Sequence, residues 1–356
     1  MRIAIVGLPY SGKTTLFEAI TGAHGTAVDR GAAAHLATVA VPDERLDALA
    51  KAFKPEKVTP AHVDFLDVAG VDSDMERERV TDVLAACREA DGIVNVVRHF
   101  NSPNAPPHPR GSLDAKRDTA ELEAELIVAD LDVVERRIVR VEKQVAKHAA
   151  TMERDKKELA ALQRLKEGLE RGQRASAIQF STEETALLKE MQFLSVKPML
   201  TVLNVSEDGL SSEATRAAAQ GLGPDTEVIC AQAEKEIAEL APEERGEFLE
   251  GLGIREPASR RIIRACYHAL GQRSFFTAGE PDVHAWTIQA GDNAVTAAGK
   301  IHSDLARGFI RAEVIAYEDF AKTGGVKEAK NAGRMHLEGK DYVVQDGDIL
   351  LIRFKV

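Results

Sequence analysis

Residues 1–17 have the sequence MRIAIVGLPYSGKTTLF. Residues 3–6 are a short apolar run, which predicts a buried strand. Residues 16–20 place apolar side chains at helical spacing, which predicts a helix. Between these two elements, residues 7–14 match the pattern G-x-x-x-x-G-K-[ST]. A strand, a glycine-containing loop and a helix in this order predict a loop that binds phosphate at a helix N-terminus.

Each fixed residue of this loop has a physical role in binding a nucleoside triphosphate. Gly7 and Gly12 leave backbone N–H groups free to surround the phosphates, because a side chain there would block them. Lys13 is expected to reach the β- and γ-phosphate oxygens, and the hydroxyl of Thr14 is expected to bind Mg²⁺. The sequence therefore predicts a nucleoside triphosphatase in which Lys13 is a catalytic residue. The nucleotide-binding residues expected in the loop are Gly7, Pro9, Tyr10, Ser11, Gly12, Lys13, Thr14 and Thr15.

The composition is typical of a soluble globular protein. The chain has 356 residues, of which 44% are hydrophobic and 29% charged, and this length is enough for two or three domains. No stretch approaches the roughly 20 apolar residues of a membrane span, and the first residues lack the apolar core of a signal peptide. The three cysteines are widely spaced, which is typical of a reducing compartment. We expect a cytoplasmic protein that makes no membrane contact.

Four further apolar runs predict buried strands. They lie at residues 63–66, 93–97, 199–203 and 228–230, and stretches with helical spacing separate them. Buried strands that alternate with helices indicate a parallel sheet with helices on both faces. We therefore predict the α/β class, with a nucleotide-binding sheet domain of the P-loop type.

Two other regions have a different pattern. Apolar residues repeat with three- and four-residue spacing over residues 122–145 and 159–169, which predicts two long antiparallel helices in a coiled-coil-like hairpin. From residue 275 onward, strand-like segments alternate with turn signals, and one of the strand-like segments lies at residues 342–344. This alternation predicts a small β-rich α+β domain. The predicted domains are a P-loop domain at 1–115 and 196–274, a helical insertion at 116–195, and a C-terminal domain at 275–356.

Three residues outside the loop are candidates for the metal and the γ-phosphate. Asp67 ends the strand at residues 63–66, where a Mg²⁺-bound water needs an acid, and Gly70 can donate its N–H to a γ-phosphate. Thr38 lies between the loop and this acid, where a switch segment would offer a second hydroxyl to Mg²⁺. The alternatives are a chance D-x-x-G match for Asp67 and Gly70, and an ordinary strand residue for Thr38.

The strand at residues 199–203 is followed by a candidate site for the base. GTPases have the motif N-K-x-D at this place, and its Asp accepts two hydrogen bonds from guanine. Here Asn204 is followed by Val205 and then by Glu207, whose extra methylene shifts the carboxylate away from the usual guanine contact. A helix cap after a strand is the alternative for Asn204. Two further candidates follow the next strand, where GTPases place Ser-Ala against the base: Cys230 and Ala231.

His108 is a candidate catalytic residue. It lies in a proline-rich loop, residues 103–109, directly after the strand at residues 93–97. A Ras-like enzyme orients the attacking water with a Gln just after D-x-x-G, and this chain has Val71 there, so another group must orient the water. The alternative is that His108 is a surface residue with no role in catalysis.

These motifs together resemble the YchF branch of the Obg-like P-loop proteins. The resemblance extends from end to end of the chain. It rests on GLPYSGKTTLF, ATVAVPD, DVAG, N-V-S-E and ELIVADLDVVERRI, and on three stretches of the C-terminal part, RSFFTAGEPDVHAWTI, AAGKIHSDLARGFIRAEV and EGKDYVVQDGDILLIRF. The last three are similar to that branch's TGS-type domain. The combination of N-x-x-E with such a domain is specific.

The resemblance implies an ATPase that associates with ribosomes. It implies ATP in preference to GTP, with Val205 beside the base, and Mg²⁺ held by Thr14 and Thr38. It also implies a loop histidine in place of the missing Gln, and His108 matches this histidine once one extra residue is allowed in the loop. Bound Mg·ATP is expected to order Thr38 and the segment after Gly70, and slow hydrolysis is expected to release them.

The sequence departs from that family in three places. Residues 71–77 contain no glycine where the family's switch is glycine-rich, Tyr10 and Ser11 stand where the family has Asn-Val, and Cys230 replaces a serine. The first departure bears on hydrolysis more than on binding. Two other functions therefore stay open, a GTPase of the same fold and a nucleotide-binding adaptor with little turnover.

The charge distribution indicates a partner. The chain has a net charge of −11, yet residues 136–174 contain twelve Lys/Arg and six Asp/Glu. A basic stretch in an acidic chain predicts a surface for a polyanion, and the resemblance offers the ribosome or its RNA as that partner, bound by the helical hairpin. We expect the protein itself to be a monomer.

Overall fold

The computed structural model divides the chain into two compact units. It describes all residues except 23–33, 69–76, 104, 146–151, 252–255 and 356. One unit consists of residues 1–37 and 64–262, and the other of residues 38–63 and 263–356. The sequence assigned residues 38–63 to the nucleotide-binding domain, whereas the contacts group them with the C-terminal part. The predicted domain boundaries otherwise stay a prediction.

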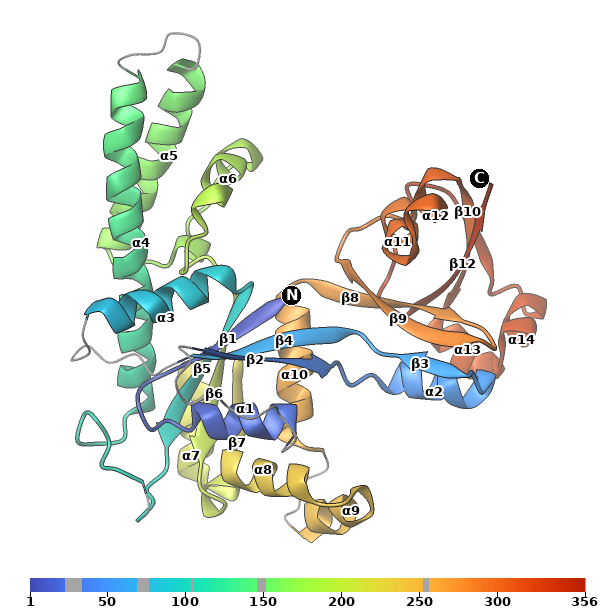
Figure 1. The fold of residues 1–356 in the computed structure, drawn as a ribbon, viewed down its shortest axis with the longest axis horizontal. Helices are drawn as coiled ribbons and strands as arrows, with labels where there is room; N and C mark the ends of the chain where they lie inside the picture. Colours follow the sequence, from blue (N-terminus) through green and yellow to red (C-terminus); the bar gives the residue numbers. More distant parts are fainter. Residues whose placement is uncertain (23–33, 69–76, 104, 146–151, 252–255, 356) are drawn as a thin grey trace. The chain divides into compact units, whose positions relative to one another are not determined.

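A six-stranded sheet carries the N-terminal motifs (Figure 1). Its strand order is β2-β4-β1-β5-β6-β7, and β1 lies between β4 and β5 with parallel pairing on both sides. The strands are β1 (Arg2–Val6), β2 (Ala34–Ala40), β4 (His62–Val68), β5 (Gly92–His99), β6 (Met199–Val205) and β7 (Thr226–Ile229). The apolar runs of the sequence lie in these strands, so the predicted α/β class is confirmed. Cys230 is the exception, because it follows β7 and caps the next helix.

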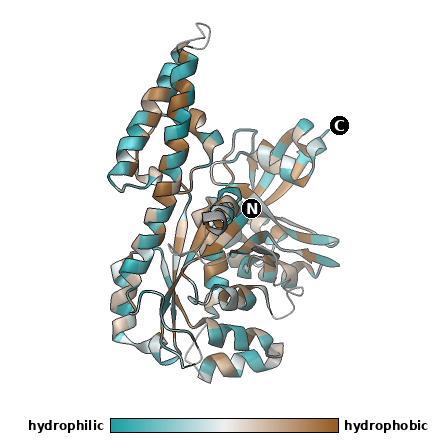
Figure 2. Ribbon diagram, turned by 60° about the vertical axis from the view of Figure 1, so that its left-hand side comes forward, coloured by the Kyte–Doolittle hydropathy of each residue, from teal (hydrophilic) through white to brown (hydrophobic). Residues whose placement is uncertain are grey.

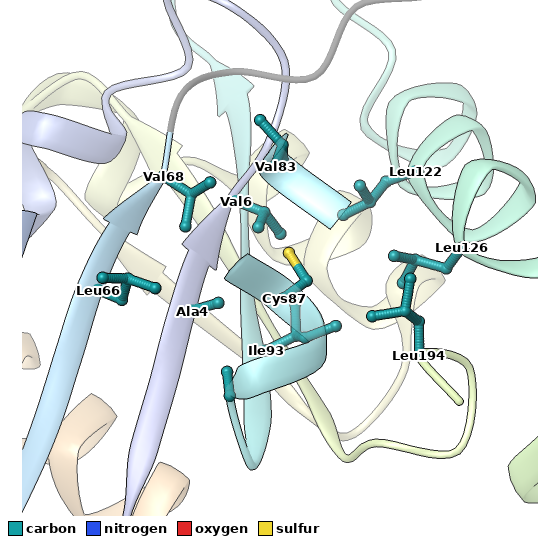
Figure 3. Close-up of a cluster of buried hydrophobic side chains, with 11 residues drawn as sticks. Ala4, Val6, Leu66, Val68, Val83, Cys87, Ile93, Leu122, Leu126 and Leu194 are labelled. Carbon is teal, nitrogen blue, oxygen red and sulfur yellow. The ribbon is translucent and has the colours of Figure 1, made fainter. Parts of the chain in front are cut away.

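Helices cover the sheet and complete its core. The helices of this unit next to the strands are α1 (Lys13–Thr21), α3 (Arg77–Glu89), α7 (Glu213–Leu222), α8 (Ala231–Glu239), α9 (Pro242–Gly251) and α10 (Ala258–Ala269), which continues into the second unit. Figure 3 shows one part of this core, where Val83 and Cys87 of α3 face Val6 of β1 and Leu66 of β4. Figure 2 shows the central strands mostly in brown, the colour of hydrophobic residues. Apolar burial on the sheet therefore holds the site's strands in place.

Two long helices extend from this sheet. They are α4 (Ala115–Val145) and α5 (Met152–Glu170), which lie side by side and run in opposite directions (Figure 1). Val134 and Val141 of α4 pack with Leu162 and Leu165 of α5 in one buried cluster. After α5 come the short helices η1 (Ala175–Ala177), α6 (Thr182–Leu188), η2 (Lys189–Met191) and, beyond β6, η3 (Asp208–Ser211). The three- and four-residue spacing of the sequence thus corresponds to a buried seam between two helices.

The base of α4 is fixed to the sheet. Leu122 and Leu126 belong to the buried cluster drawn in Figure 3. Asp130, which is completely buried, accepts hydrogen bonds from the backbone N–H groups of Leu194 and Ser195 at 2.8 and 2.7 Å. A buried carboxylate is stable only when its oxygens are satisfied, as they are here. The first half of α4 is therefore part of the sheet core, and only its second half extends away.

The second unit contains a mixed sheet with helices. The strand order is β11-β10-β12-β8-β9-β3. The strands are β3 (Lys57–Thr59), β8 (Gln272–Ala278), β9 (Asp282–Gln289), β10 (Phe309–Ala316), β11 (His336–Glu338) and β12 (Asp348–Phe354), and the helices are α2 (Glu44–Phe53), α11 (Ala294–Ile301), α12 (Ser303–Arg307), α13 (Tyr317–Thr323) and α14 (Val326–Asn331). The predicted strand at residues 342–344 is wrong, because only Val343 makes a bridge, to Asn293.

Segment 38–63 is joined to the rest of this second unit by strand pairing and by ion pairs. β3 pairs with β9 in parallel. Arg45 donates hydrogen bonds to Asp43 at 2.9 Å and to Asp346 at 2.9 Å, and its guanidinium lies over the ring of Phe276. These contacts link α2 to residues far along the chain. Among the described residues, no helix combines the length and the apolar character needed to cross a membrane.

Candidate nucleotide-binding site

The phosphate-binding loop has the backbone that its glycines require. Gly7 and Gly12 have φ angles of 149° and 93°, and a Cβ on Gly12 would lie 2.2 Å from the side-chain nitrogen of Asn204. Both positions therefore exclude other residues, by conformation and by space. Tyr10 also has a positive φ of 63°, and its side chain is exposed. Asn adopts this conformation more readily than Tyr, so Tyr10 has a backbone conformation that is uncommon for its residue type.

Lys13 is buried at the first position of α1. Its side chain is 7% exposed, and Nζ donates a hydrogen bond to the carbonyl oxygen of Leu8 at 2.9 Å. Burial lowers the pKa of Lys13 to about 8, and the nearby Asp67 carboxylate opposes this only in part. The loop thus holds an ammonium group that lacks a full set of counter-charges. A phosphate beside it would supply them.

Thr14 and Asp67 meet beside this lysine. The hydroxyl of Thr14 donates to Oδ2 of Asp67 at 2.9 Å, and Thr14 is exposed. Oδ1 of Asp67 is buried and has no hydrogen-bond partner among the described residues. Burial raises the pKa of Asp67, while the Thr14 hydrogen bond and the Lys13 charge lower it in part.

This pair of residues fits a magnesium ion. A hydroxyl and a carboxylate with one unused oxygen are hard oxygen donors, which Mg²⁺ prefers, and Mg²⁺ usually takes only one or two protein ligands beside phosphates and waters. In keeping with so few ligands, no group of three or more His, Cys, Asp or Glu side chains with metal-site geometry occurs in the described part of the chain.

Asn204 connects the loop to the end of the sheet. Its side-chain nitrogen donates to the carbonyl oxygen of Ser11 at 2.9 Å, and its side-chain oxygen accepts from the backbone N–H of Ala231 at 3.0 Å. The side chain is buried. Asn204 therefore braces the phosphate-binding loop against the start of α8, in addition to its predicted place near the base.

The other base candidates lie around this bracing residue in different environments. Val205 is 2% exposed and packs with Val97 and Ala115 in a hydrophobic cluster, so its side chain is part of the core. Glu207 is exposed, and its charge adds to burial in raising the pKa of the Cys230 thiol. Glu207 and Cys230 are thus neighbours, and the structure brings together two of the predicted base-binding residues.

His108 is buried, although a histidine in a proline-rich loop is usually a surface residue. It is 8% exposed, and its Nδ1 accepts a hydrogen bond from the backbone N–H of Arg110 at 3.1 Å. Its Nε2 lies 3.0 Å from Oδ2 of Asp118, in the first turn of α4. These two atoms are at ion-pair distance, although their angle does not meet hydrogen-bond geometry. The surface alternative for His108 is therefore wrong, while its role in catalysis stays a prediction.

Asp118 was not found from the sequence. It is one of several acids at the start of a charged helix, where acidic residues commonly stabilise the helix dipole. Only its position ten residues after His108 connects the two, and such a spacing has no general meaning. A second residue of this loop, Arg110, also pairs with an acid of α4, Glu121.

Several candidates stay predictions. Pro9, Tyr10 and Thr15 line the loop or open α1, next to the residues described above. Gly70 lies outside the described residues, and so do residues 71–76 of the glycine-free switch. Thr38 is exposed on β2 and belongs to the second compact unit. Its contact with a metal is therefore a prediction from the sequence alone.

The basic stretch is less basic in three dimensions than in the sequence. Among the bases that the structure describes, seven form ion pairs, and five of the acids in these pairs lie outside residues 136–174. The pairs are Arg136–Asp132, Arg137–Glu158, Lys156–Glu153, Lys157–Glu183, Arg164–Glu184, Lys166–Glu135 and Arg174–Glu123. The count along the sequence left out acids that the fold brings to these bases, and the predicted polyanion-binding surface stays a prediction.

The fold and the loop define a P-loop nucleotide-binding protein. Two family models match the chain. Residues 2–129 match a model described as "50S ribosome-binding GTPase", and residues 273–355 match the YchF-GTPase_C model, described as "Protein of unknown function (DUF933)".

Relatives cover the chain from end to end. It is 41% identical over 371 residues to the ribosome-binding ATPase YchF of Bacillus subtilis, with 100% of both chains covered. It is 40% identical over 365 residues to the protein of the same name from Escherichia coli O157:H7, with 100% of this chain and 99% of that one covered. The solved structure of the Schizosaccharomyces pombe YchF GTPase is 26% identical, with a TM-score of 0.84 and coverage of 99% and 97%. The chain therefore belongs to the YchF family, and the resemblance stated from its motifs is confirmed.

Proposed function

We propose that this chain is a Mg²⁺-dependent ATPase of the switch type that associates with the ribosome. The observation that carries the proposal is the phosphate-binding loop, where Lys13, Thr14 and Asp67 lie together at the N-terminus of α1. Relatives that match the whole chain are named ribosome-binding ATPases. Membership of that family supports the same activity here.

The residues of the loop can do most of what phosphoryl transfer requires. Lys13 and the backbone N–H groups at the start of α1 bind the phosphates and stabilise charge that develops on them. Thr14 and Asp67 would hold the magnesium ion, which when bound neutralises phosphate charge. His108 would orient the attacking water in place of the missing Gln. Thr38 and the segment after Gly70 would respond to the γ-phosphate.

We propose that the protein binds ATP in preference to GTP. The side chain at position 207 is a glutamate, and it lies near Cys230 at the edge of the base site. Its extra methylene displaces the carboxylate from the place where an aspartate accepts from guanine. A GTPase of the same fold is the second candidate, because the matching N-terminal model and the Schizosaccharomyces structure are both described as GTPases.

Titration with both nucleotides separates the two candidates. We expect ATP to bind more tightly than GTP, and Glu207→Asp to move the preference toward guanine. Asp208→Asn is a suitable control, since it removes a neighbouring exposed charge without changing position 207. Equal or reversed affinities in the parent protein would exclude the adenine preference. An adaptor without turnover would bind ATP and show no hydrolysis in a single-turnover experiment.

Contact with ribosomal RNA is proposed for part of the hairpin only. Arg140, Lys143 and Arg154 are exposed and make no ion pair with any residue that the structure describes. They lie near the end of α4 and the start of α5, so they gather at the far end of the hairpin. Free cations of this kind bind phosphates and release counterions. A monomeric state and a cytoplasmic location complete the proposal.

A further inference from the structure

His108 is held in a way that leaves it no nitrogen for a water. Nδ1 accepts from the Arg110 backbone, and Nε2 faces the carboxylate of Asp118 at 3.0 Å. A histidine orients or activates water only through a ring nitrogen within hydrogen-bond reach of it. Nδ1 is occupied by the Arg110 backbone, and Nε2 is buried against the Asp118 carboxylate, so neither ring nitrogen is open to a water. In this conformation His108 cannot take part in hydrolysis.

Asp118 is placed so that it can release His108 at low cost. Its other oxygen, Oδ1, accepts two hydrogen bonds from the guanidinium of Arg117, at 2.9 and 2.8 Å. Arg117 is itself anchored, because it donates to the carbonyl oxygen of Ser112 at 2.7 Å. When His108 leaves, Asp118 is still paired with a cation. The large penalty of an isolated buried charge is therefore avoided.

The partner of His108 belongs to a rigid element, whereas His108 belongs to a loop. Asp118 lies in α4 one turn before Leu122, which is buried in the sheet core (Figure 3). His108 lies between β5 and α4 in a segment with no regular structure. A change between held and released states is thus a movement of the loop away from a fixed carboxylate. This loop follows β5 at the same edge of the sheet as the phosphate-binding loop, because the strands are parallel.

We propose that Asp118 is a latch, a positioning residue that holds His108 in a withdrawn conformation and lowers the basal rate of hydrolysis. The inference rests on the proposed function, since it needs an ATPase in which His108 orients the water. If only a fraction of molecules has His108 released, the observed rate is reduced to that fraction. Weakening the latch then raises the rate without any new contact to the nucleotide.

The test uses Asp118→Asn and Asp118→Ala in the full chain. Asparagine has nearly the same shape and removes the negative charge that faces Nε2, and alanine removes the contact altogether. We expect single-turnover ATP hydrolysis to rise about tenfold, the order of size of one close contact with a buried charged group, with unchanged ATP affinity. Two variants are used so that one that fails to fold does not decide the result.

Two further variants show whether the effect acts through His108. Glu121→Gln removes the partner of Arg110 in the same loop, from the same helix, without touching His108. It should leave the hydrolysis rate within about twofold of the parent, as expected for a partly exposed pair. In the double variant His108→Ala with Asp118→Asn, the gain should vanish and the rate should equal that of His108→Ala alone. A merely structural role of Asp118 would not produce this dependence.

The outcomes separate the latch from the proposed function. A parent protein that hydrolyses ATP while both Asp118 variants are unchanged or slower overturns the latch and leaves the ATPase intact. An equal gain in Glu121→Gln overturns it as well, because general loosening of the loop would then be the cause. A gain that persists without His108 has the same meaning. Absence of ATP hydrolysis in the parent and in every variant contradicts the ATPase itself.

Discussion

The phosphate-binding loop and the loop that carries His108 lie at the same edge of one sheet. They differ in how far each already has the conformation that its proposed function needs. In residues 7–14 the backbone already has the conformation that phosphates require, and Lys13 lacks only its counter-charge. In the loop between β5 and α4 the candidate catalytic side chain, His108, is buried, and its Nε2 lies 3.0 Å from Oδ2 of Asp118. If Asp118 is the proposed latch, nucleotide binding needs little rearrangement, whereas hydrolysis needs a movement of the chain. We therefore expect slow hydrolysis.

The largest expected effect comes from a substitution in the phosphate-binding loop. Lys13→Ala should weaken ATP binding by about 100-fold or more, since it removes one partner of a buried charge pair with phosphate. Because burial already disfavours the lysine charge, the melting temperature should not fall.

Calorimetric titration and thermal unfolding together check this prediction. Lys235→Ala is a matched control, because Lys235 pairs with Glu18 of the same helix α1 near the surface. That variant should bind ATP like the parent. Parent-like affinity in Lys13→Ala would show that the phosphates bind elsewhere.

The sequence alone was sufficient to predict the phosphate-binding loop. It was not sufficient to predict the contacts of the loop that carries His108. The phosphate-binding loop is contiguous, so its pattern contains the whole structure, and the apolar runs before and after it define strand and helix. The contact between His108 and Asp118 joins residues that no periodicity connects. The grouping of segment 38–63 with residues 263–356 could not be found from the sequence for a related reason. Its strand β3 has three residues and is mostly exposed, so no apolar pattern indicates its pairing with β9.

The charges of the hairpin illustrate the same limit. A count over residues 136–174 includes every base but excludes acids such as Asp132, Glu183 and Glu184, which the fold brings to those bases. The apolar seam, in contrast, was predictable, because both of its sides repeat along their own helices. A pattern within one element can thus be recovered from the sequence, whereas the neutralisation of a charge depends on which elements become neighbours.

A substitution in the loop that carries His108 should have the second largest effect. His108→Ala should lower single-turnover hydrolysis by about 100-fold, the low end for a group that orients or activates water. ATP affinity should change little, because His108 is bound to Asp118 and not to the phosphate-binding loop.

Hydrolysis and binding have to be measured on the same preparation. A loss of both would indicate damage to the fold, which the melting temperature would reveal. A rate equal to that of the parent would show that another group orients the water, and the contrast between the two loops would then concern structure only.

A third prediction concerns the far end of the hairpin that α4 and α5 form. Replacing Arg140, Lys143 and Arg154 by alanine should weaken ribosome binding at low salt by about tenfold or more. It should also reduce the slope of log association constant against log salt by about two, because each phosphate contact contributes about 0.7–0.9.

The matched control replaces three bases that the structure shows in ion pairs, Arg136, Lys157 and Lys166. Their removal should change the slope less. Equal effects of the two sets would mean that the ion pairs do not shield those bases, and no effect of either set would assign ribosome binding to another surface. Hydrolysis without ribosomes should be the same in both sets.

The smallest effect concerns the counter-charge that Lys13 lacks. In the free protein its pKa is about 8, and bound phosphate should raise this pKa because negative charge favours the ammonium form. Binding therefore takes up a proton between the two pKa values. The contribution of Lys13 to affinity should be nearly constant below about pH 7 and should fall as the pH rises through the free-state value, by about fourfold at pH 8.5, where roughly a quarter of the lysines remain charged.

Proton uptake can be measured directly by calorimetric titration in buffers of different ionisation enthalpy. At pH 8.5 we expect an uptake of most of one proton per ATP, and at pH 7 very little from this group. The γ-phosphate is fully ionised at the higher pH, so it does not mask the lysine. An affinity and a proton count that do not change between pH 7 and pH 8.5 would mean that Lys13 is already fully charged in the free loop. The phosphate-binding loop would then be no less satisfied than the loop that carries His108, and the contrast between them would lose its electrostatic part.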